Sequence, residues 1–76
     1  MDADDNLIRM ANRIGDFFDS MPCREEALAG ISDHVRKFWE PRMRRELMAH
    51  LAAGGEGLSE IVVDALTRDR EALTPA

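Results

Sequence analysis

The sequence has few of the features that small proteins use for covalent stability or membrane attachment. Among its 76 residues, Cys23 is the only cysteine. No disulfide can therefore form within the chain, which is typical of a reducing compartment. No apolar run approaches the roughly 18 residues that span a bilayer, and the N-terminal MDADDN lacks the basic and apolar parts of a signal peptide. We expect a soluble, cytoplasmic protein with no membrane partner.

The length is sufficient for one small domain. A chain this short buries a smaller share of its surface than a larger domain does, so its margin of stability is expected to be thin. With disulfides excluded, a partner subunit is the leading source of added stability.

The chain is acidic, with 15 Asp and Glu against 10 Lys and Arg. A net charge of −5 argues against general affinity for nucleic acid. Five of the ten basic residues nevertheless fall within positions 36–45, around the motif FWEPRMRR: Arg36, Lys37, Arg42, Arg44 and Arg45. A helical nucleic-acid-binding module that uses this stretch is the alternative hypothesis, although acidic residues at both ends of the chain disfavour it.

The composition predicts helices, because Ala, Leu, Arg, Glu and Met are plentiful whereas Tyr is absent and Val, Ile and Thr are sparse. Pro22, Pro41 and a glycine-rich turn at 54–57 divide the chain into four helical segments, near 5–20, 22–40, 41–53 and 59–68. We expect an all-α fold, a small bundle of three to four short helices. Residues 6–67 form the domain, preceded by an acidic head at 1–5 and followed by a fraying tail at 68–76.

The first segment has a pronounced apolar face. At 100° per residue, seven apolar side chains share one side of the helix: Leu7, Met10, Ala11, Ile14, Phe17, Phe18 and Met21. The opposite side is polar: Arg9, Asn12, Arg13, Asp16 and Asp19. Ile8 and Gly15 lie beyond the edge of the apolar stripe, which indicates either a second contact there or a tolerated surface isoleucine.

Nothing in the sequence indicates a catalytic, cofactor or metal site. Cys23 lies in the first turn of a predicted helix beside Arg24, but neither histidine is near it. His34 and His50 occupy different segments without the spacing of a helical metal site. The glycine-rich turn follows a helix and not a strand, so it is a poor match to nucleotide-binding loops. We expect no enzymatic activity of the chain's own and no cofactor.

Residue types at the corner between the second and third segments favour a protein partner. Tryptophan and arginine are enriched at interface hot spots, and the break at Pro41 gives Trp39 a rigid mount. Phe38 is expected to pack into the core, whereas Trp39, Arg42 and Arg45 are expected to face a partner. The alternative, in which Phe38 and Trp39 both fill the core and the arginines are simply solvated, stays open.

Three sequence blocks, together with their spacing, give the chain a resemblance to a known family. The blocks are LIRMANRIGDFFDSMP (7–22), HVRKFWEPRMRREL (34–47) and HLAAGGEGLSEIV (50–62). Together they resemble the delta subunit of soluble NAD-dependent formate dehydrogenases, over roughly residues 6–66. The acidic head and the tail lie outside the resemblance.

The resemblance implies a small accessory subunit of a complex that oxidises formate at a molybdenum or tungsten centre in a large alpha subunit and reduces NAD elsewhere. It implies a delta chain without a cofactor that binds the alpha subunit and supports assembly or stability. Residue type and position, and not the family motif, make Trp39, Pro41, Arg42, Arg44 and Arg45 the expected partner-binding residues. In isolation the chain is expected to cover the same surface by forming a homo-oligomer.

Overall fold

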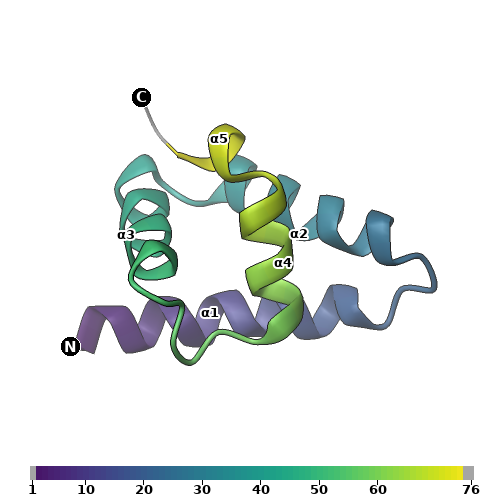
Figure 1. Ribbon diagram of the computed structural model, residues 1–76, viewed down its shortest axis with the longest axis horizontal. Coiled ribbons are helices and arrows are strands. Elements are labelled where there is room, and N and C mark those ends of the chain that lie inside the picture. The colour runs from purple at the N-terminus through teal and green to yellow at the C-terminus, as the bar shows by residue number, and fades with distance from the viewer. Residues whose placement is uncertain (1, 75–76) are drawn as a thin grey trace.

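The computed structural model describes residues 2–74, which contain five helices and no strand (Figure 1). These helices are α1 (Asp2–Asp19), α2 (Arg24–Phe38), α3 (Pro41–Ala52), α4 (Glu60–Arg68) and the short α5 (Arg70–Leu73). The prediction of an all-α fold is confirmed, and the four predicted segments match α1 to α4 within a few residues. Helix α1 begins at Asp2, so it also includes residues 2–5 of the expected acidic head.

The helices enclose one core. In Figure 1, α1 runs along the long axis of the molecule, and α4 rises from α1 toward α5. Helix α2 packs against α1, α4 and α5, and α3 packs against α1, α4 and α5 at the other end. The core side chains come from every helix and from the α2–α3 corner: Leu7, Ala11, Ala27, Ile31, Val35, Trp39, Leu47, Met48, Ile61, Val62, Ala65, Leu66 and Leu73.

A glycine in α1 allows α4 to approach closely. A Cβ atom at Gly15 would lie 2.6 Å from Cγ2 of Val62, too close for any side chain larger than hydrogen. Nearby, Ile8 is half-buried and lies against Gly57 in the loop before α4. The edge of α1 that carries Ile8 and Gly15 therefore makes a second contact, which decides between the two interpretations of the sequence pattern.

Two side chains hold the loop between α3 and α4. The Asn12 Nδ2 group donates to the carbonyl of Gly57 at 2.9 Å, and the Ser59 backbone N–H donates to Asn12 Oδ1 at 2.8 Å. His50 Nε2 lies 2.7 Å from the carbonyl oxygen of Glu56, and because a carbonyl only accepts, this nitrogen carries the proton. Asn12, expected on the polar face opposite the core, thus anchors the loop from which α4 begins.

The C-terminal residues differ from the expected fraying tail. Helix α5 follows α4 after Asp69, and the Leu73 side chain is fully buried in the core. Helix α5 packs against α2, α3 and α4. Sequence periodicity missed this contact because one turn of helix is too short to show a repeat. Residues 75–76 of the expected tail lie outside the described residues.

Candidate protein-interaction surface

The corner between α2 and α3 reverses the expected positions of its two aromatic side chains. Phe38 is the last residue of α2 and is 72% exposed, so the prediction that it packs into the core is wrong. Trp39 has extended backbone angles (φ −90°, ψ 139°) and is 6% exposed. The chain leaves the helix at Trp39, because Glu40 precedes a proline and avoids helical angles. That change of direction turns the indole into the core, where it offers little surface to a partner.

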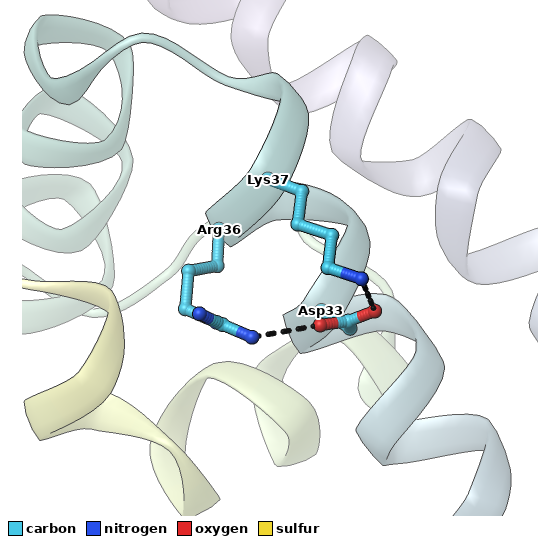
Figure 2. A network of polar contacts seen from close by, with 3 residues as sticks. All are labelled: Asp33, Arg36 and Lys37. Carbon is cyan, nitrogen blue, oxygen red and sulfur yellow. Dashed lines mark hydrogen bonds and ion pairs between the residues drawn. The ribbon is translucent and has the colours of Figure 1, made fainter.

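The basic residues just before this corner are paired within α2. Arg36 Nη2 lies 2.9 Å from Asp33 Oδ1, and Lys37 Nζ lies 3.3 Å from Asp33 Oδ2 (Figure 2). The pKa of Asp33 is lowered from its usual 3.8, chiefly by the hydrogen bond from Lys37 and further by Arg36. This triad (Asp33, Arg36 and Lys37) is solvent-exposed, so its net effect on stability is small. It nevertheless uses two of the five clustered positive charges to neutralise one carboxylate.

Four of the residues expected to bind a partner lie at the start of α3. We name them the basic corner: Pro41, Arg42, Arg44 and Arg45. Pro41, Arg42 and Arg45 are exposed, and the Arg42 side chain is 83% exposed with its Nε 3.9 Å from Glu46 Oε2. Arg44 is half-buried, and its Nε atom is buried without a hydrogen-bond partner among the described residues. The basic corner is accessible, and its binding to a partner stays a prediction.

Sequence reasoning missed a second surface, which is aromatic. Phe17 of α1 is 71% exposed, although the sequence placed it on the core face of that helix. Its ring meets the ring of Phe18 edge-on, with centroids 5.0 Å apart. On α2, the His34 ring lies 4.8 Å from the ring of Phe38. Two large exposed phenylalanines on a chain this small are typical of a surface that another molecule covers.

Phe17, Phe18 and His34 line a shallow groove, which we name the α1–α2 groove, and Phe38 contacts it through the His34 ring. It encloses about 350 Å³ and is lined by Arg13, Ile14, Phe17, Phe18 and His34. Apart from the guanidinium and the imidazole, its walls are apolar. By contrast, the hollow between α2 and α5 is lined by the charged side chains of Asp33, Arg36, Arg68 and Asp69. The α1–α2 groove is thus suited to apolar side chains.

The floor of this groove depends on a glycine within α2. A Cβ atom at Gly30 would overlap the Phe18 ring, coming within 2.6 Å of its Cδ1 atom. The Phe18 ring therefore lies directly on the backbone of α2. Because Gly30, His34 and Phe38 are spaced four residues apart, they share one side of that helix. In the sequence, the available signal for the groove was a mid-helix glycine followed at four-residue intervals by two aromatic residues.

The reactive side chains of Cys23 and His50 lie in different parts of the fold. Cys23 is exposed at the N-cap of α2, and His50 holds the loop through Glu56. Over the part of the chain that the structure describes, no three His, Cys, Asp or Glu side chains gather as a metal site would require. Within the same part, no helix is long and apolar enough to cross a bilayer.

Comparison with known protein families matches residues 6–66 to the NADH-dependent formate dehydrogenase delta subunit FdsD. The chain belongs to this family. The match begins at Asn6 within α1 and ends at Leu66 near the end of α4. It therefore includes both the basic corner and the α1–α2 groove. Helix α5 lies beyond it. No curated protein and no solved structure gives a significant match to the chain. The resemblance found in the sequence blocks is confirmed, and with it membership of a formate dehydrogenase complex.

Proposed function

We propose that this chain is a non-catalytic accessory subunit that binds the large, molybdopterin-containing alpha subunit of formate dehydrogenase and supports assembly or stability of the active complex. Family membership over residues 6–66 carries this proposal. The family description names a subunit of the enzyme, and we infer that this chain acts by occupying a surface of the complex. The proposed place of action is the cytoplasm, where the soluble enzyme oxidises formate.

The structure supports a binding role through the amount of apolar surface that the folded chain leaves exposed. Phe17 and Phe38 both project from a domain that buries its other large apolar side chains wholly or in part, apart from Met10. Each phenylalanine that leaves water on binding contributes roughly 1.5–3 kcal/mol before the costs of association. Two such exposed side chains on a small domain supply an energetic basis for a stable contact.

Binding of this kind stabilises both partners by mass action. A subunit present at about 100 times its dissociation constant stabilises the folded form of its partner by roughly 2.7 kcal/mol. The same linkage adds to the thin stability expected of a 76-residue chain. The accessory role therefore needs no chemistry from this chain, only a complementary surface.

Removal of the chain from the native host tests the proposal. We expect the deletion strain to contain less assembled enzyme, with an alpha subunit that loses activity at a lower temperature. A plasmid-borne wild-type chain restores both quantities, and affinity-tagged chain co-purifies with the alpha subunit. Unchanged enzyme yield and unchanged thermal inactivation, together with failure to co-purify, would overturn the proposal.

A further inference from the structure

We propose that the α1–α2 groove is the docking site for the alpha subunit, and that its occupant is an amphipathic helix with apolar side chains facing Phe17 and Phe38 and a carboxylate facing Arg13 and His34. This inference rests on the proposed function and adds the surface and the chemistry of the partner segment. It replaces Trp39 as the expected aromatic anchor, since the indole lies in the core.

The first argument is a mismatch between the apolar stripe of α1 and the part of α1 that is buried. The stripe includes Met10 and Phe17, yet these side chains are 38% and 71% exposed. Burial instead extends over the other edge of the helix, to Gly15 and, in part, Asn12. The core covers only one side of the stripe. On the uncovered side, Phe17 lines the α1–α2 groove, whereas Met10 lines a separate hollow beside Met43 of α3. Helical grooves lined in this way receive apolar side chains of a partner helix at i, i+3 or i+4, and i+7.

The second argument is that the groove is already formed in the isolated chain. Phe18 is fixed against the backbone at Gly30, and it supports Phe17 through an edge-on contact at 89° between the ring planes. Phe38 is supported by the His34 ring. Supported rings lose less conformational freedom on binding than mobile ones, so more of the buried area contributes to affinity.

The third argument is charge. The chain carries a net charge of −5, but the side chains that interrupt the apolar lining of the groove are Arg13 and His34. Among residues 6–74, whose side chains the structure describes, Arg13 forms no ion pair. Asp33 of α2 lines the hollow between α2 and α5 and already pairs with Arg36 and Lys37. A partner carboxylate at this position gains a guanidinium neighbour without displacing an existing pair.

Charge also argues against a second copy of this chain as the occupant. In a two-fold dimer, the same patch contacts itself, so two copies joined through this groove would bring Arg13 and His34 of each close to those of the other. Two molecules of charge −5 also repel each other at long range. The expected homo-oligomer of the isolated chain is untested, and these charges disfavour it at this surface.

Binding to enzyme purified from the deletion strain tests the inference. Fluorescence anisotropy of the labelled chain gives the dissociation constant, and three variants are compared with wild type. They are Phe17→Ala with Phe38→Ala, Arg13→Glu, and Arg42→Ala with Arg45→Ala at the basic corner, which is the competing surface. Circular dichroism and the urea midpoint establish that each variant is folded. We expect about a hundredfold weaker binding for the phenylalanine pair, about tenfold for Arg13→Glu and less than about threefold for the arginine pair.

The outcomes separate this inference from the proposed function. If wild-type chain does not bind the deletion-strain enzyme, the proposed function fails. If wild type binds and the phenylalanine pair binds within twofold of it, the function stands and the groove is excluded. Loss of binding in the arginine pair alone assigns the contact to the basic corner and also overturns the inference. If the wild-type chain is a dimer, and the phenylalanine-pair variant is monomeric but binds the enzyme as tightly as wild type, the groove is assigned to a second copy. That result overturns the inference as well.

Discussion

Phe38 and Trp39 are neighbours in the chain, yet Phe38 is 72% exposed whereas Trp39 is 6% exposed. Helix α2 ends between them, and the extended backbone of Trp39 directs its indole toward the core. One helix terminus thus fixes a large side chain inside the domain and leaves another on its surface. The two side chains are expected to respond oppositely to truncation.

Trp39→Ala is expected to lower the free energy of unfolding by about 3–5 kcal/mol, because it removes a large buried ring and leaves a cavity. In a small domain this loss is comparable to the whole margin of stability. Phe38→Ala is the matched control, and it is expected to change stability by less than about 0.5 kcal/mol. Urea denaturation followed by circular dichroism measures both. Equal destabilisation by the two variants would contradict the reversed positions of the two rings.

Gly30→Ala is expected to destabilise the protein, although alanine normally favours a helix over glycine by about 1 kcal/mol. The added methyl group overlaps the Phe18 ring, which must move and distort the floor of the α1–α2 groove. Overpacking of this kind costs about 1–3 kcal/mol. Ala29→Gly at the exposed neighbouring position measures the intrinsic helix preference alone. A stabilised Gly30→Ala variant would mean that Phe18 does not lie on the α2 backbone.

Asn12→Ala is expected to loosen the loop before α4, because it removes a donor to Gly57 and an acceptor for the Ser59 N–H. Leaving a partly buried amide unpaired costs about 1–3 kcal/mol. Asn12→Asp retains the acceptor and loses the donor, so it separates the two interactions. Hydrogen exchange at the Ser59 amide is expected to accelerate in Asn12→Ala and to stay slow in Asn12→Asp. Equally fast exchange in both variants would show that the Asn12 oxygen does not protect this amide.

The Asp33 carboxyl is expected to titrate below its usual pKa of 3.8, chiefly because Lys37 donates a hydrogen bond to its ionised form. A lowered pKa means that the folded state binds the proton less readily than the unfolded state does. The stabilising contribution is therefore present above the unfolded pKa and is lost as pH falls through the lower, folded pKa. NMR titration of the Asp33 side-chain carbon measures this value. Lys37→Ala is expected to raise it, and an unchanged midpoint would contradict the pairing in Figure 2.

Helix positions were predictable from sequence because their boundaries depend on local chemistry. Pro41 and the glycines at 54–57 interrupt the chain where α3 begins and ends, so all-α architecture and approximate bounds follow from breakers and composition. The family was predictable from the sequence blocks over residues 6–66, and the comparison confirms it.

The positions of individual aromatic side chains were not predictable in the same way. Periodicity shows that Phe17 lies on an apolar stripe, but it does not show which edge of the stripe meets the neighbouring helices. Whether Phe38 and Trp39 are buried or exposed depends on the residue at which α2 ends. Helix ends are the part of a helix that a sequence pattern defines least well. Leu73 enters the core through a long-range contact of a single turn, which leaves no repeat in the sequence.

Photo-crosslinking within the assembled enzyme tests the central claim most directly. A p-benzoylphenylalanine side chain replaces Phe17 or Phe38, both exposed in the free chain, and Arg45 at the basic corner serves as the comparison position. We predict that irradiation links the chain to the alpha subunit from positions 17 and 38, with little product from position 45. Crosslinks to the alpha subunit from position 45 alone, with none from the two phenylalanine positions, would contradict docking through the α1–α2 groove.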